Sequence, residues 1–172
     1  MDLKSKIRVI PDFPKEGISF KDITTLLLDK DAFKETINVL KAAVEKYDFD
    51  YIAGIEARGF IIGAPLAIEL GKGFLPIRKP GKLPGKVIKE SYDLEYGSNE
   101  IEMDSEALKS GDKVLILDDL LATGGTAVAA AKLVESTGAK VAAIGFLVEL
   151  TELKGMDMLS NYETFSVLKY DK

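Results

Sequence analysis

Two adjacent carboxylates, Asp118 and Asp119, follow directly after the aliphatic residues Val114–Leu117. A strand that runs into two acids places their charge at the edge of a core, where charge is costly without a partner. The pair could accept hydrogen bonds from neighbouring hydroxyls of a sugar, or hold Mg²⁺ through water. In a purely structural role, the two side chains would cap nearby backbone amides.

A glycine-rich turn, Thr123-Gly124-Gly125-Thr126, comes four residues after Asp119, between an expected strand and an expected helix. Glycines allow backbone N–H groups to converge on an anion, and the start of a helix adds partial positive charge. The pattern predicts a phosphate cup; the alternative is a tight turn with a threonine N-cap. The Gly-Lys-Ser/Thr of a P-loop is absent, which disfavours hydrolysis of nucleoside triphosphates. Acceptors for sugar hydroxyls followed by a phosphate cup predict a ribose 5-phosphate site.

Composition restricts the remaining chemistry. The 172 residues are 47% hydrophobic, which fits a single domain with a full core. The chain contains no His, so any acid–base catalysis must use Asp, Glu, Lys or Tyr. It contains no Cys, and no apolar stretch suggests a signal peptide or a membrane span. We therefore expect a cytoplasmic protein without a membrane partner.

Charge is distributed unevenly along the chain. The formal net charge of −5 argues against binding of nucleic acid, which relies on a basic surface. In the segment Leu70–Lys89, however, every charged residue is a cation: Lys72, Arg78, Lys79, Lys82, Lys86 and Lys89. By itself such a run is usually a solvated loop. In an acidic protein it also suits a small polyanionic ligand.

Hydrophobic periodicity predicts alternating strands and helices. The expected helices are 31–47 with Asp31 as N-cap, a helix that ends at Gly71, and a helix that reaches about Ser136. The expected strands are 50–55, 73–77, 113–117, 141–150 and an edge strand at 163–170. Residues 88–103 are expected to form an extended excursion with a turn at 97–99. These elements predict an α/β fold: a mainly parallel sheet with helices on both faces, and ligands beyond the carboxyl ends of its strands.

The run VLILDDLLATGGT resembles the signature for 5-phosphoribosyl-1-pyrophosphate (PRPP) of the type I phosphoribosyltransferase family. The resemblance extends over nearly the whole chain. IPDFPKEGISFKDIT, DYIAGIEARGF, PIRKPGKLPG, YDLEYG, DDLLATGGT and FLVELTELKG follow the order found in the branch of the family that uses adenine. Relatives that use hypoxanthine or xanthine share the PRPP signature but not KLPG together with LEYG.

The resemblance implies a reaction, adenine + PRPP → AMP + pyrophosphate, and a type I phosphoribosyltransferase fold over residues 1–172. It implies Mg²⁺ held through PRPP, without direct protein ligands, and a homodimer with the basic loop near the subunit interface. Residues 1–30 would form the base-binding segment. Residues from about 82 to 103 would form a mobile loop, or hood, that closes over the site and carries Glu95, beside Tyr96, as the acid–base residue.

The same resemblance assigns binding roles to individual residues. Contacts with ribose are expected from Asp118 and Asp119. Contacts with the 5-phosphate are expected from Ala122, Thr123, Gly124, Gly125 and Thr126. Contacts with pyrophosphate are expected from Ala57, Arg58, Gly59, Arg78, Lys79 and Lys82. Contacts with adenine are expected from Ile18, Ser19, Phe20 and Leu120. Lys21 stands where some members have Arg, and an ammonium does not offer the bidentate contact of a guanidinium.

Three alternatives remain from the sequence. The chain could transfer phosphoribose to another purine, or it could be a regulator that senses PRPP or purines without turnover. Such a regulator would be expected to lack the acid–base carboxylate, whereas Glu95 is present. A general nucleotide-binding module would leave the cationic segment unexplained.

Overall fold

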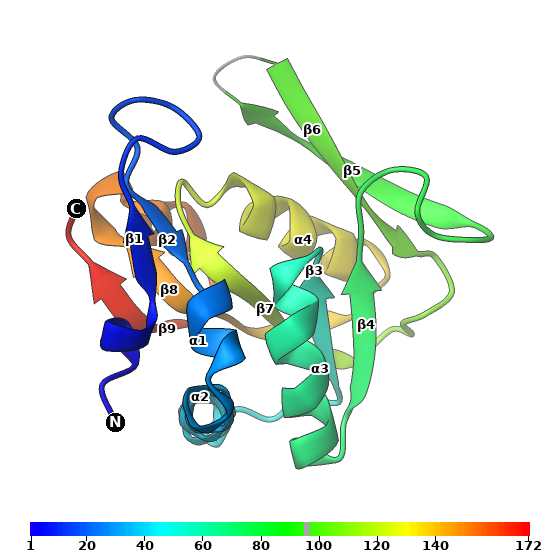
Figure 1. The fold of residues 1–172 in the computed structure, drawn as a ribbon. Coiled ribbons are helices and arrows are strands. Elements are labelled where there is room, and N and C mark those ends of the chain that lie inside the picture. The colour runs from blue at the N-terminus through cyan, green and yellow to red at the C-terminus, as the bar shows by residue number, and fades with distance from the viewer. Residues whose placement is uncertain (95–96) are drawn as a thin grey trace.

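The computed structural model describes residues 1–94 and 97–172 and contains one large and two small sheets. The large sheet has the strand order β4-β3-β7-β8-β9, and all of its neighbouring strands are parallel. Its strands are β3 (Tyr51–Ile55), β4 (Gly73–Ile77), β7 (Lys113–Leu121), β8 (Lys140–Leu150) and β9 (Thr164–Tyr170). This order places β7 in the centre and β9 at an edge, as expected for the last strand (Figure 1).

Helices cover both faces of the large sheet, which confirms the expected architecture (Figure 1). The helices are α1 (Thr24–Leu28), α2 (Lys30–Val44), α3 (Arg58–Leu70) and α4 (Gly125–Ser136), and short 3₁₀ turns lie at Leu3–Lys6, Thr151–Leu153 and Gly155–Leu159. Strand residues alternate between the two faces: Leu115 packs with α2 and α3, whereas Ile116 packs with α4. In the described part of the chain, no helix is both long and apolar enough to span a membrane.

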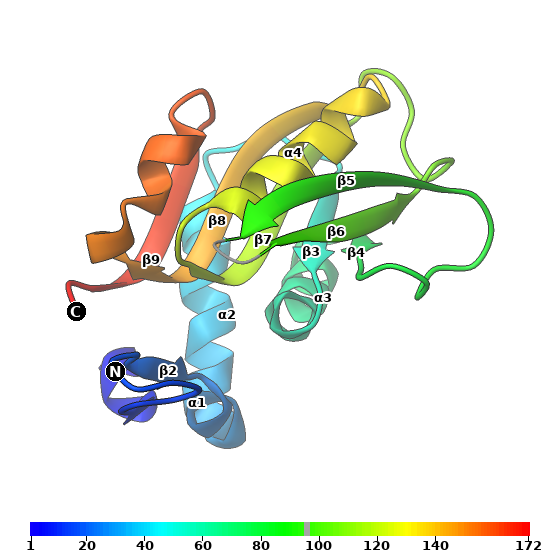
Figure 2. The same cartoon turned by 90° about the horizontal axis from the view of Figure 1, so that it is seen from above.

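Two antiparallel ribbons flank the carboxyl edge of the sheet. One joins β1 (Arg8–Ile10) to β2 (Phe20–Asp22). The other is a hairpin of β5 (Val87–Leu94) and β6 (Gly97–Asp104), which lies along α4 (Figure 2). A backbone bridge between Arg78 and Glu102 fixes this hairpin to the end of β4. The predicted hood is therefore a regular ribbon over much of its length.

Three local predictions were wrong. Asp29, not Asp31, caps α2, because its carboxylate accepts the amides of Asp31 and Ala32. The turn expected at 97–99 is strand, because residues 97–99 pair with residues 92–94 of β5. The strand expected at 113–117 continues to Leu121, because Leu120 and Leu121 still pair with β8.

Candidate active site

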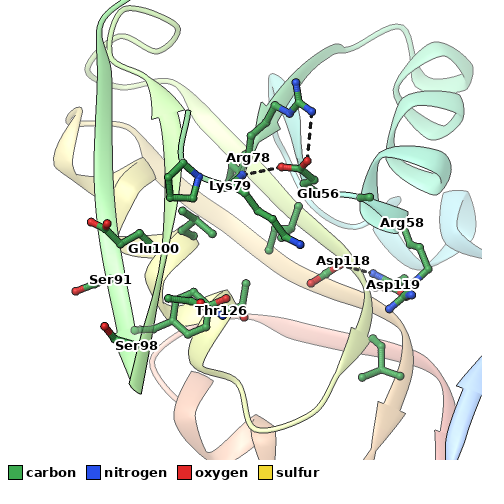
Figure 3. Close-up of a pocket in the computed structure, with 18 residues that line it drawn as sticks. Glu56, Arg58, Arg78, Lys79, Ser91, Ser98, Glu100, Asp118, Asp119 and Thr126 are labelled. Atoms are coloured by element: carbon green, nitrogen blue, oxygen red, sulfur yellow. Dashed lines mark hydrogen bonds and ion pairs between the residues drawn. The ribbon is translucent and has the colours of Figure 1, made fainter. Parts of the chain in front are cut away.

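A cavity of about 860 Å³ opens at the carboxyl ends of β3, β4 and β7 (Figure 3). The β3–α3 turn and the end of β7 form one side, and the hairpin forms the other, with Ser91, Ser98 and Glu100 among its lining residues. The site therefore lies where the sequence places it, beyond the carboxyl ends of parallel strands. The contribution of the hairpin strands was not predicted residue by residue.

Asp118 and Asp119 are the last polar residues of β7 and both line this cavity. Asp119 is buried, and Nε of Arg58 donates to its Oδ2 at 2.6 Å. Burial, and then the adjacent charge of Asp119, raise the pKa of Asp118 well above its usual value. Its Oδ1 accepts the amide of Asp119 at 2.8 Å. The two neighbouring acids therefore have different surroundings: Asp119 is paired with Arg58, whereas burial and the charge of Asp119 disfavour the charge of Asp118.

The glycine turn forms the wall of a second, small cavity of about 80 Å³. All five residues predicted to hold the 5-phosphate line it: Ala122, Thr123, Gly124, Gly125 and Thr126. Gly124 has a φ of +96°, and a Cβ there would lie 2.8 Å from the carbonyl oxygen of Gly155. Among the described residues, no Lys or Arg lines this cavity. Any anion bound here would depend on backbone amides, the threonine hydroxyls and the start of α4.

The β3–α3 turn carries Ala57, Arg58 and Gly59, which were predicted to meet pyrophosphate. A Cβ on Gly59 would lie 3.1 Å from the carbonyl oxygen of Leu117, so glycine lets the start of α3 approach the end of β7 closely. Ala57 and Arg58 line the large cavity, whereas Gly59 serves the packing beneath it.

Glu56 was missed by the sequence analysis. Its carboxylate accepts the amide of Lys79 at 2.6 Å and Nη2 of Arg78 at 3.2 Å, and these bonds lower its pKa. The guanidinium of Arg78 is turned toward Glu56, whereas the side chain of Lys79 extends toward Asp118 (Figure 3). Lys82 is exposed and does not line the cavity, although its carbonyl oxygen accepts Nη1 of Arg78 at 3.5 Å. The one sequence signal for the pairing of Glu56 with Arg78 is that this acid follows an expected strand and precedes the cationic segment.

The residues predicted to hold adenine are only partly brought together. The guanidinium of Arg58 lies over the ring of Phe20, 5.8 Å from its centroid, and Phe13 contacts the same ring edge-on at 5.1 Å. Leu120 lines the cavity, whereas Ile18 and Ser19 are exposed and lie outside its lining. Arg58 therefore links Phe20 of the N-terminal ribbon to Asp119 of β7. Glu95 and Tyr96, predicted to perform acid–base work, lie outside the described residues.

The central strand of the parallel sheet ends in an acid pair and a glycine cup, beneath a projecting hairpin. These features define the class: the chain has the type I phosphoribosyltransferase fold. A family model described as "Phosphoribosyl transferase domain" matches residues 25–169. An adenine phosphoribosyltransferase of Halothermothrix orenii is 57% identical over 169 residues, which cover 98% of this chain and 99% of that protein.

Two solved structures agree with this assignment. An adenine phosphoribosyltransferase of Thermoanaerobacter pseudethanolicus has a TM-score of 0.96 and 53% identity, covering 98% of each chain. The Saccharomyces cerevisiae adenine phosphoribosyltransferase, complexed with an imino-altritol bisphosphate and adenine, has a TM-score of 0.93 and 42% identity, covering 97% of each chain. The chain belongs to the adenine phosphoribosyltransferase family.

Proposed function

We propose that this chain catalyses adenine + PRPP → AMP + pyrophosphate. The observation that carries the proposal is the spatial order along the cavity edge: a cup with no Lys or Arg among its described lining residues, then two acids, then the turn that carries Arg58. This order matches the 5-phosphate, ribose and pyrophosphate of PRPP. The adenine phosphoribosyltransferases that cover almost the whole chain support adenine as the base.

Displacement at the anomeric carbon forms the bond to a purine nitrogen and breaks the bond to pyrophosphate. By analogy with glycosidic chemistry, the transition state resembles an oxocarbenium ion. The enzyme must therefore hold the two substrates in line and stabilise the departing anion. Arg58 and Lys79 would meet pyrophosphate, while Arg78 and Lys82 would support that end of the site. The negative charges near ribose would favour the cationic centre.

The ion pair between Arg58 and Asp119 implies an exchange of partners when PRPP binds. Asp119 would then accept ribose hydroxyls, and the guanidinium of Arg58 would turn to pyrophosphate. Both groups keep a charged hydrogen bond, so neither is left buried without a partner. The face of Phe20 now covered by Arg58 would become available to adenine, with Leu120 on the other side.

Glu95 is proposed to exchange a proton with the purine ring. Among residue types, a carboxylate is a reasonable choice because the chain has no His. Closure of the hairpin over the cavity would exclude water, which would otherwise hydrolyse PRPP.

Magnesium is proposed to be held mainly by pyrophosphate and ribose oxygens of PRPP, with Asp118 and Asp119 reaching it through water. Carboxylates are the hard oxygen ligands that this ion prefers. Within residues 1–94 and 97–172, no three acidic side chains gather as a metal-binding group. When bound, the ion would neutralise charge that develops on the leaving group.

A homodimer is also proposed, and α3 offers a surface for it. Ile61 and Ile68 lie on one face of this helix and are 41% and 81% exposed. Sedimentation equilibrium of the wild type and of Ile68→Lys tests this: the wild type should be a dimer that Ile68→Lys weakens. A monomeric wild type would reject the proposal.

Release of pyrophosphate should be measured with PRPP and, in turn, adenine, hypoxanthine, guanine and xanthine. We expect the highest kcat/KM with adenine. Comparable or higher kcat/KM with hypoxanthine or guanine would assign the chain to another purine. Tight PRPP binding without turnover of any base would instead indicate a regulator.

A further inference from the structure

Lys21 is a buried lysine that the proposed reaction does not use. Its side chain belongs to a residue only 5% exposed, beside the adenine segment. Its ammonium donates to Oγ of Ser19 at 2.7 Å and to the backbone oxygen of Lys172 at 3.0 Å. It also lies 5.0 Å from the centroid of the Tyr170 ring. Burial lowers its pKa. These contacts join residues near the two ends of the chain.

Strand geometry places the side chains of Lys21 and Phe20 on opposite sides of the segment. Neighbouring residues of a strand point to opposite sides, and residues two apart point to the same side. Lys21 and Ser19 therefore share one side of the segment, as their hydrogen bond shows, and Phe20 takes the other. Phe20 is expected to stack on adenine, and the contacts of its neighbour Lys21 lie on the opposite side of the segment.

Among the described residues, the N-terminal ribbon forms no backbone ladder with the large sheet: its strands β1 and β2 pair with each other. Side-chain contacts therefore contribute to the distance between this ribbon and β7. Lys21 provides one such contact at the end of β9. From there the path to Leu120 runs through the sheet: Tyr170 pairs with Leu150 of β8, and Val148 of β8 pairs with Leu120.

We propose that Lys21 is a positioning residue for the base: its ammonium fixes the β1–β2 ribbon to β9 and so sets the gap between Phe20 and Leu120. This inference rests on the proposed function, because it takes that gap to be the adenine slot. An incorrect gap would weaken stacking of the base and leave the phosphate cup unchanged.

The test compares Lys21→Met with Lys21→Arg and with a matched control, Lys4→Met. Lys4 also lies over the Tyr170 ring, at 4.6 Å, but it is exposed and is not one of the residues predicted to contact adenine. Lys21→Met removes both hydrogen bonds of the ammonium and should raise the KM for adenine by about tenfold or more, since one charged hydrogen bond is already worth about 1.5–3 kcal/mol, with little change in the KM for PRPP. Lys21→Arg retains donors for both acceptors and should stay close to the wild type. Lys4→Met should leave both KM values unchanged.

The KM for adenine and the KM for PRPP separate positioning from general stability. Equal increases in both, together with a lower Tm, would assign Lys21 a structural role only and overturn the inference. An unchanged KM for adenine in folded Lys21→Met would also overturn it, as would an equal effect of Lys4→Met.

Tyr170→Leu provides a second route if Lys21→Met does not fold. It removes the ring beneath the ammonium but keeps the backbone pairing, and should raise the KM for adenine alone. An unchanged KM for adenine in this variant would contradict the inference. A wild-type chain that forms no AMP would instead reject the proposed function, so the two failures are distinguishable.

Discussion

The two ends of the cavity are built to receive anions in different ways. The cup at Ala122–Thr126 lies in a small cavity without Lys or Arg among its described lining residues, and its shape depends on glycine. The opposite end carries Arg58 and Arg78, each already paired with an acid, Asp119 or Glu56. A fixed phosphate suits a fixed backbone cup, because neither group needs to move during the reaction. A leaving group suits side chains that can exchange partners as charge develops.

The largest expected effect is at the rigid end. Gly124→Val should abolish AMP binding, because a β-branched residue disfavours a φ of +96° and its Cβ would collide with Gly155. Gly111→Val is a matched control: its φ is +92°, but a Cβ there would meet nothing within 4 Å. Titration calorimetry should show no AMP binding only for Gly124→Val. Normal affinity in a folded Gly124→Val chain would place the cup elsewhere.

The next effect concerns the acids between the two ends. Asp118→Asn with Asp119→Asn should lower kcat/KM for PRPP by about 10²–10⁴-fold, as two charged hydrogen bonds are each worth about 1.5–3 kcal/mol. Asp48→Asn removes an exposed acid paired with Lys113 and should leave kcat/KM unchanged. Steady-state kinetics with varied PRPP measures both variants. Wild-type kcat and KM in the double variant would make the pair structural.

Glu95→Gln should slow the chemical step without weakening the binding of PRPP at either anion site. General acid–base catalysis contributes about 10²–10⁴-fold, so kcat should fall within that range while the KM for PRPP changes little. Single-turnover rates are required, because slow product release could hide a loss in the chemical step. A single-turnover rate within about threefold of wild type would remove Glu95 from the mechanism, leaving catalysis to leaving-group stabilisation.

The smallest effect is on stability, and it should differ between the two neighbouring acids. The raised pKa of Asp118 means that its charge destabilises the fold increasingly as pH rises above about 4, the pKa of an unperturbed Asp. Asp118→Asn should therefore raise Tm at pH 7, with a gain that shrinks toward pH 4. A stabilisation of about 1 kcal/mol would raise Tm by about 2–4 °C in a domain of this size.

Asp119→Asn should lower Tm at pH 7, because it removes the charged partner of Arg58. Thermal unfolding of both single variants between pH 4 and pH 8 measures the contrast. Equal shifts of the same sign would show that the two acids share one environment.

The contrast between the glycine cup and the paired arginines also explains which parts of the site could be predicted from the sequence. The cup is local: Gly124 and the start of α4 are adjacent in the chain, so a short motif specifies their geometry. The pairs Arg58–Asp119 and Arg78–Glu56 join residues 61 and 22 positions apart, and no local pattern specifies which acid meets which cation. The parallel sheet was predictable from its doubly apolar strands. The extension of β7 through its two acids was not, because it depends on pairing with β8.

The most direct test of this account is a crystal structure of the chain with PRPP, Mg²⁺ and a non-reactive adenine analogue. We expect the 5-phosphate within hydrogen-bond distance of the backbone amides of residues 123–126, and the pyrophosphate beside Arg58 and Lys79. We also expect the bond between Arg58 and Asp119 to be broken, with ribose hydroxyls on Asp119. Pyrophosphate in the glycine cup, or an intact Arg58–Asp119 pair beside bound PRPP, would contradict the division of the cavity into a rigid and an exchanging end.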